Sequence, residues 1–188
     1  AFAREREWLR ALLAPPGFAP PLGAFAVRGN SDRYNWHTIF EGTAVRPLDD
    51  GTADLPERNV LVVGLGMGTS GDAGPDALRR MFPDDPPGRF TIALGHYPEF
   101  AFPPDGEPPF DLCLAGHTHG GQVVLPLLGP PITLTRVPRR SAAGGMFRIG
   151  GSWRYVSRGV GMERGDAPRL RFLCRPEIGI LDLAPEGG

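Results

Sequence analysis

The hydrophobic residues of this chain fall into short runs, most of which end on loops rich in glycine, proline or histidine. Residues 4–13 place Trp8 and three leucines on one face at helical spacing, which predicts a surface helix packed on a core. Continuous apolar runs such as 60–63 are typical of strands buried on both faces of a sheet. Strands are expected at residues 24–27, 60–63, 90–94, 110–114, 122–125, 153–157, 170–173 and 178–183.

The order of these elements predicts the fold class. Apolar strands alternate with short helices in the first half, one of them at 77–82, and are joined by glycine and proline turns in the second. This order indicates an α/β fold with sheets at its centre. The chain shows no internal repeat and no linker, and segments 84–88 and 103–109 have the composition of surface loops. We therefore expect residues 1–188 to form a single domain.

Length, charge and cysteine content exclude several classes of protein. The 188 residues suit one ordinary domain, and 20 basic against 21 acidic residues leave a net charge of -1. That balance argues against sequence-independent nucleic-acid binding, which needs a basic surface. Cys113 and Cys174 each lie in an apolar run, so we expect buried thiols rather than a disulfide framework. No apolar stretch approaches the roughly 20 residues of a membrane-spanning helix, and we expect a cytoplasmic or membrane-peripheral protein.

Three of the four histidines, His96, His117 and His119, follow closely on expected strands, where α/β sheets collect their functional loops. In Gly116-His-Thr-His-Gly-Gly121 the alternating histidines project to the same side of an extended stretch, which suits two neighbouring metal ions. The glycines permit a tight backbone path. Neutral imidazole is a common ligand of zinc-like and iron-like ions. We therefore expect a metal site, with hydrogen-bonded structural histidines as the alternative.

Three sequence blocks resemble those of a known enzyme superfamily. The blocks are Val27-Arg-Gly-Asn-Ser-Asp32, Gly95-His-Tyr-Pro98 and Leu114-Ala-Gly-His-Thr-His-Gly-Gly-Gln122. They are similar to the GNH(D/E), isolated-histidine and GHxH blocks of the calcineurin-like metallophosphoesterase superfamily. Further likeness to its bacterial branch with a GHTHGGQ block comes from Leu125-Pro126, Tyr155-Val-Ser-Arg-Gly159 and Arg175-Pro-Glu-Ile178.

This resemblance implies a four-layer α/β/β/α sandwich and a metal-dependent phosphoesterase. It assigns Asn30, His96 and His117 to one metal of a dinuclear site, and His119 to the other. The cofactors would be two divalent ions among manganese, iron, zinc, cobalt and nickel. They would serve hydrolysis of phosphomonoester, phosphodiester or pyrophosphate bonds in a small-molecule or lipid substrate, with membrane association left open. Arg158 would bind the substrate phosphate, the alternative being a surface arginine at a strand end.

The chain departs from the superfamily pattern at two points. The Asp-x-His and Gly-Asp-x-x-Asp blocks, which supply the remaining metal ligands, do not precede Asn30. We therefore expect the C-terminal part of a longer protein, incomplete at its N-terminus, that holds at most one ion well. Asp72 and Asp76 only superficially resemble the second block, and we expect loop and helix-capping roles for them. Ser31 stands where the superfamily has a histidine, which removes general-acid assistance worth roughly 10²–10⁴-fold.

Other functions and roles remain as alternatives. His37 is a candidate replacement for the missing acid, against a surface or core role. Ser31 and the absent carboxylates favour a degenerate, non-catalytic family member that binds a metal or phosphate ligand in a regulatory role. A dinucleotide site at Gly64-Leu-Gly-Met-Gly68 is excluded, because the third glycine falls one residue early and no acidic residue ends a second strand about 20 positions on.

Overall fold

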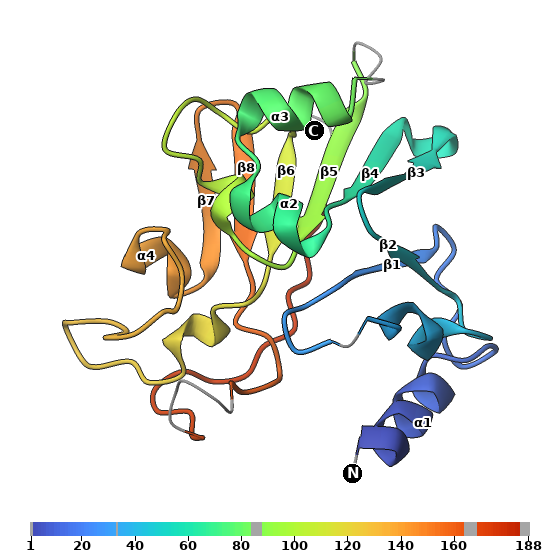
Figure 1. The fold of residues 1–188 in the computed structure, drawn as a ribbon, viewed down its shortest axis with the longest axis horizontal. Coiled ribbons are helices and arrows are strands. Elements are labelled where there is room, and N and C mark those ends of the chain that lie inside the picture. The colour runs from blue at the N-terminus through green and yellow to red at the C-terminus, as the bar shows by residue number, and fades with distance from the viewer. Residues whose placement is uncertain (1, 33, 84–87, 164–168, 185–188) are drawn as a thin grey trace.

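A six-stranded mixed sheet forms the centre of the computed structural model, which describes residues 2–32, 34–83, 88–163 and 169–184 (Figure 1). Its strand order is β3-β4-β5-β6-β8-β7. The strands are β3 (Gly51–Leu55), β4 (Val60–Gly64), β5 (Phe90–Gly95), β6 (Leu112–Ala115), β8 (Ser152–Val156) and β7 (Gly145–Ile149). The four inner strands run parallel, and β3 and β7 pair antiparallel at the two edges. A separate parallel pair joins β1 (Ala24–Val27) to β2 (Val45–Leu48).

The two faces of the large sheet bury different partners. Along β4, Leu61 and Val63 belong to a core cluster that includes Leu78 of a helix, while Val62 belongs to a second cluster with Leu48 of β2. This alternation follows from the twofold repeat of side chains along a strand. Helices α2 (Met67–Asp72) and α3 (Pro75–Met81) accordingly lie on one face, and the β1–β2 pair packs against the other.

The remaining elements are short. Helix α1 (Phe2–Leu12) packs on a 3₁₀ helix, η1 (Trp36–Phe40), where Arg10 donates to the carbonyl of Thr38 at 2.6 Å. The others are η2 (Pro56–Arg58), η3 (Glu99–Ala101), η4 (His119–Gly121) and α4 (Arg139–Ala142). Within the described part of the chain, no helix has the length and apolar character needed to cross a bilayer.

The α/β class is confirmed, and the strongly apolar strands lie where the sequence predicts them. Helix α1 forms as predicted, but Trp8 is 66% exposed, so the expectation that its apolar face is packed on a core is wrong. The strands predicted at 122–125 and 170–173 shrink to isolated bridges, one between Val123 and Phe172 and one between Leu125 and Gly129. Residues 178–183 adopt no regular structure. The four-layer arrangement and the single domain stay predictions.

Several elements escaped the sequence reading because their patterns are weak. Strand β2 contains Pro47, and β3 has one buried residue, Ala53. Strand β7 begins at the second glycine of the pair Gly144-Gly145. Both thiols, Cys113 and Cys174, are buried and unpaired as expected. Of the predicted loop 84–88, residues 84–87 lie outside the described residues.

The parallel strands end together at one edge of the sheet, the lower edge in Figure 1. In the ladder between β5 and β6, Gly95 pairs with Ala115, and in the ladder between β6 and β8, Ala115 pairs with Val156. The loops that follow these strands therefore begin side by side. This edge gathers the residues that the sequence singles out.

Substituting Gly64 tests the packing of the two sheets. A Cβ atom at this position would lie 2.1 Å from Cβ of Leu48, so we expect Gly64→Ala to lower the free energy of unfolding by about 1–3 kcal/mol. Gly68→Ala is the matched control, because that position in α2 has open space around its Cβ and should lose no stability. Urea unfolding followed by circular dichroism measures both variants, and equal midpoints for the two would contradict the packing.

Candidate metal centre

Three polar side chains from separate loops converge at the carboxyl edge of the sheet. Oδ1 of Asn30 lies 2.8 Å from Nε2 of His96, and the same His96 nitrogen lies 3.2 Å from Nδ1 of His117. Asn30 follows β1, His96 follows β5 directly, and His117 follows β6 by one residue. These are the three residues that the resemblance assigns to one metal, and the fold brings them together although Asn30 and His96 lie 66 positions apart in sequence.

The hydrogen bonds of His117 fix which of its nitrogens can bind a cation. Nε2 of His117 lies 3.0 Å from the carbonyl oxygen of Leu134. A carbonyl oxygen only accepts, so Nε2 carries the proton and Nδ1 keeps its lone pair. In metal-binding histidines one ring nitrogen generally donates a hydrogen bond of this kind, which fixes the tautomer and the orientation of the ring so that the other nitrogen can bind the metal. By the same rule Nε2 of His96 donates to Oδ1 of Asn30, and a metal ion would take the place of that proton. An amide oxygen and two imidazole nitrogens thus face one another, which is a donor set that fits a borderline divalent metal ion.

Burial keeps His96 neutral. The pKa of His96 is lowered to about 4, mainly by removal from water and to a smaller extent by the neighbouring His117 and His119. The ring also lies against the backbone of Gly29, where a Cβ would come within 3.1 Å of two ring atoms. At neutral pH this imidazole is uncharged, as a metal ligand must be.

His119 lies near Asn30, His96 and His117 but does not share the hydrogen bonds that join them. Its ring lies near Gly161, and burial is the main cause that lowers its pKa, followed by the positive charge of Arg171. Both His117 and His119 have left-handed backbones, with φ of 67° and 49°. Such conformations cost energy in residues other than glycine and are concentrated at functional sites.

The two glycines after His119 are required by packing. A Cβ on Gly120 would lie 2.7 Å from Sγ of Cys174 and 2.9 Å from Cγ of Arg158. A Cβ on Gly121 would lie 2.3 Å from Cβ of Pro130. Both glycines also have positive φ. The His-Gly-Gly stretch therefore forms a bend that neighbouring loops enclose, which holds the backbone of His119 in place.

Arg171 ties the loops around His119 together. Its guanidinium donates to the carbonyl oxygens of Arg158 at 2.7 Å, Gly159 at 3.1 Å and His119 at 3.3 Å, and also to that of Gly161. The sequence reading missed this residue. Its signal was a charged side chain inside an apolar run, Leu170-Arg-Phe-Leu-Cys174, which is where a paired, partly buried arginine is expected.

The loop that carries Asn30 is shaped by Asp32. Its carboxylate accepts a hydrogen bond from the backbone N–H of Gly29 at 2.8 Å, and its own N–H donates to the Gly29 carbonyl at 3.0 Å. Ser31 at the turn is exposed. His37 is exposed on η1, a segment that packs on α1 and β2. The structure therefore joins Asn30 to the histidines but brings neither Ser31 nor His37 into contact with them.

Arg158 and the two aspartates of the superficially similar block make other contacts. The Arg158 guanidinium bonds Glu177 at 3.3 Å and the carbonyl of Ala143 at 3.0 Å, so part of its fork is engaged in structure. Asp72 pairs with Arg136 and Asp76 pairs with Arg79, each at 2.9 Å on the surface. The predicted capping role of these two aspartates is wrong, because the N-caps of α2 and α3 are Gly66 and Gly74 and neither helix has a side-chain cap hydrogen bond.

Carboxylates do not complete the cluster in the described part of the chain. There, no group of three or more His, Cys, Asp or Glu side chains is gathered as a metal site. The donors that meet are two imidazoles and an amide.

A cavity of about 610 Å³ adjoins the cluster. Tyr97 forms one wall, and its ring centroid lies 4.4 Å from that of His117. Leu134, whose carbonyl binds His117, forms another wall, and Arg136 lies at the same cavity. The sequence reading also missed Tyr97, which follows His96 directly.

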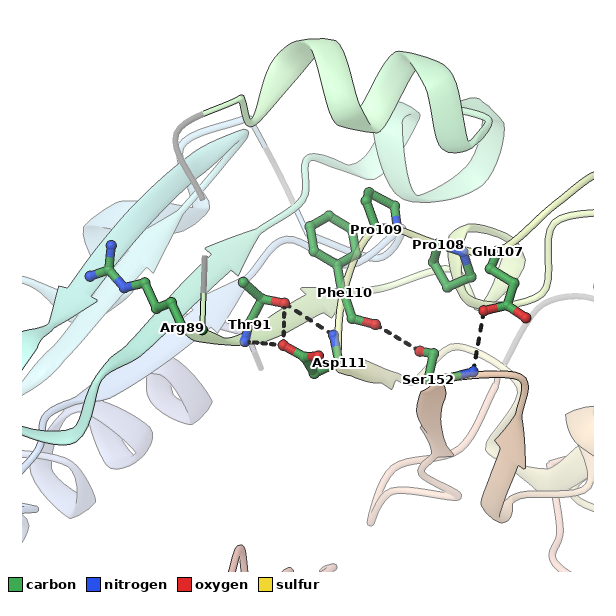
Figure 2. A pocket seen from close by; sticks show the side chains of 10 residues that line it. Arg89, Thr91, Glu107, Pro108, Pro109, Phe110, Asp111 and Ser152 are labelled. Atoms are coloured by element: carbon green, nitrogen blue, oxygen red, sulfur yellow. Dashed lines mark hydrogen bonds between the residues drawn. The ribbon is translucent and has the colours of Figure 1, made fainter. Parts of the chain in front are cut away.

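A second cavity, of about 440 Å³, lies at the opposite edge of the sheet (Figure 2). Its polar groups already bind one another: the Asp111 carboxylate accepts from the N–H of Thr91 at 2.7 Å and from its hydroxyl at 2.8 Å. The Ser152 hydroxyl donates to the carbonyl of Phe110 at 2.8 Å. These bonds join the starts of β5, β6 and β8. The polar groups of this cavity therefore hold neighbouring strands together and are not part of the histidine cluster.

Comparison with known proteins finds four similar curated sequences. The chain is 44% identical over 94 residues to the uncharacterized metallophosphoesterase YkuE of Bacillus subtilis, covering 50% of this chain and 31% of that protein. It is 36% identical over 129 residues to the phosphodiesterase YaeI of Escherichia coli, covering 68% and 43%. It is 30% identical over 194 residues to an uncharacterized metallophosphoesterase of Aquifex aeolicus, covering 98% and 69%. The chain thus spans less than half the length of the first two relatives. No family model and no solved structure matches it.

Removing the Arg171 side chain tests its role in holding the loops. Each charge-assisted hydrogen bond to a carbonyl contributes about 1.5–3 kcal/mol, and partial exposure reduces this, so we expect Arg171→Ala to cost about 2–3 kcal/mol of unfolding free energy. Arg175→Ala, at an exposed position nearby, should change stability by less than about 0.5 kcal/mol. Chemical unfolding compares the two, and an equal effect of both substitutions would refute the role.

Proposed function

The chain belongs to the calcineurin-like metallophosphoesterase superfamily, and from this membership we propose that it hydrolyses phosphoester bonds at a metal site built on Asn30, His96 and His117. The observation that carries the proposal is the meeting of one amide oxygen and two imidazole nitrogens at the carboxyl edge of the sheet. Bound divalent ions would supply Lewis-acid polarisation of the phosphoryl group and would lower the pKa of the attacking water.

The chain's own residues contribute orientation and charge state. The hydrogen bond from His117 to Leu134 holds the ring so that Nδ1 faces His96. Burial holds His96 neutral, and Asp32 shapes the turn that presents Asn30. In this proposal His119, held by Arg171 and by the packed glycines, serves the second ion of a dinuclear site.

The substrate proposed is a phosphorylated small molecule with a good leaving group. The name of the Escherichia coli relative, a phosphodiesterase, supports a diester. Ser31 has no useful acidity near neutral pH, so substrates whose leaving group needs no proton are favoured. Pyrophosphate-linked diesters meet this condition, and the cavity beside Tyr97 has room for the group on the far side of the bond.

A non-catalytic relative is the second candidate. The cluster lacks a carboxylate among the described residues, and the position of the usual acid is a serine. Such a protein would still bind a metal or a phosphate ligand at the same edge. The two candidates differ in turnover and not in metal binding.

The test combines metal content with turnover. The purified chain is loaded with manganese, analysed for bound metal, and assayed with bis(p-nitrophenyl) phosphate. We expect His117→Ala to lower both metal content and hydrolysis at least about tenfold, since loss of even an outer partner of a metal ligand costs 10–100-fold. A variant that keeps its metal and its turnover would refute the site. Bound metal without turnover in the parent chain would leave two interpretations, the non-catalytic candidate and an enzyme whose upstream ligand blocks lie outside this chain, and the upstream sequence would decide between them.

His37→Ala is the matched histidine control. His37 is exposed on η1, so we expect unchanged metal content. Its turnover answers a further question, because unchanged hydrolysis would exclude His37 as the missing acid, whereas a loss at constant metal content would support that hypothesis.

A further inference from the structure

A leucine-rich loop projects from the edge that carries the histidines. This leucine loop, residues 125–134, is closed at its base by two backbone hydrogen bonds between Leu125 and Gly129, at 2.9 and 3.0 Å. At its tip Leu127 is fully exposed and Leu128 is 76% exposed. Ile132 and Leu134 are also exposed large apolar residues. Single exposed leucines are normal on protein surfaces, but this loop exposes several together.

The loop is held in place, so its leucines cannot turn inward by local relaxation. Pro130 is buried against the backbone of Gly121. The carbonyl of Leu134 binds the ring of His117. Proline at 126, 130 and 131 further restricts the backbone. The loop therefore presents a preformed apolar tip, and ordering it on a partner would cost little conformational entropy.

The charge next to the loop is positive. Between Leu112 and Met162 the sequence has six arginines and no aspartate or glutamate. In the fold, however, Arg136 pairs with Asp72, and Arg158 pairs with Glu177. The positive charge beside the loop is therefore that of Arg139 and Arg140. Arg139 and Arg140 lie on α4, directly after the loop, and both are exposed. An aliphatic tip flanked by exposed arginines complements a partner that has an apolar interior beneath a layer of negatively charged groups.

We propose that the leucine loop inserts into the surface of a lipid bilayer that contains anionic lipids. The convex tip offers two aliphatic side chains without an aromatic anchor, which is far less than the roughly 800 Å² that each partner buries in a stable protein interface. One shallow apolar contact combined with a few basic residues gives weak, reversible binding. Insertion would place the histidine edge of the sheet next to the bilayer. The proposal does not depend on catalysis.

Vesicle binding tests this proposal without metal or substrate. The 188-residue chain is sedimented with vesicles of phosphatidylcholine, with or without about a third phosphatidylglycerol. We expect binding to the anionic vesicles that weakens as salt is raised. The double variant Leu127→Ser with Leu128→Ser should bind at least about tenfold more weakly. Arg139→Gln with Arg140→Gln should lose the preference for anionic vesicles.

The matched control removes two equally exposed aliphatic side chains elsewhere. Ile178 and Ile180 flank Gly179, whose backbone lies against the Tyr155 ring of β8, and they are 83% and 88% exposed. Ile178→Ser with Ile180→Ser should bind like the parent chain, and circular dichroism checks that every variant is folded. Absent binding, or equal binding by the leucine-loop variant, would overturn the proposal. Self-association that the leucine-loop variant abolishes, without vesicle binding, would also overturn it and identify a contact between copies.

Discussion

The histidine cluster depends on the parallel register of β5 and β6, in which Gly95 lies opposite Ala115. Because this pair ends both strands at the same level, His96 and His117 leave the sheet side by side, and their ring centroids lie 5.0 Å apart. A slip of one residue would turn one set of side chains to the opposite face of the sheet. The bonds between Thr91 and Asp111 at the other end of these strands fix the same register.

The rest of the site is built around that pair by loops that hold unfavourable conformations in place. His117 and His119 keep left-handed backbones because the residues around them leave no alternative. Gly120 and Gly121 fit against Cys174 and Pro130, and Arg171 bonds the loops from outside. The histidine loop is thus enclosed by its neighbours, although its only regular structure in the described part is the short 3₁₀ helix η4.

The sequence predicted the parts of the molecule that depend on local hydrophobic pattern. Strands β4, β5 and β6 are apolar runs, so their ends, and the polar residues after them, could be located. The meeting of Asn30 with His96 followed from the resemblance, since no local pattern links residues in different sheets. The direction of the Arg158 side chain could not be predicted, because a long flexible side chain at a strand end reaches several partners. Segments 170–173 and 178–183 have strand composition, but a strand forms only where a neighbouring strand offers a continuous ladder.

The position of Asn30 outside the large sheet makes the complete cluster a product of tertiary docking. The two imidazoles come from adjacent strands of one sheet, whereas the amide oxygen arrives only when β1 and β2 dock on β4 and β5. A change that loosens the packing of the small sheet would therefore separate the oxygen donor from the two nitrogen donors, which stay together on their own sheet.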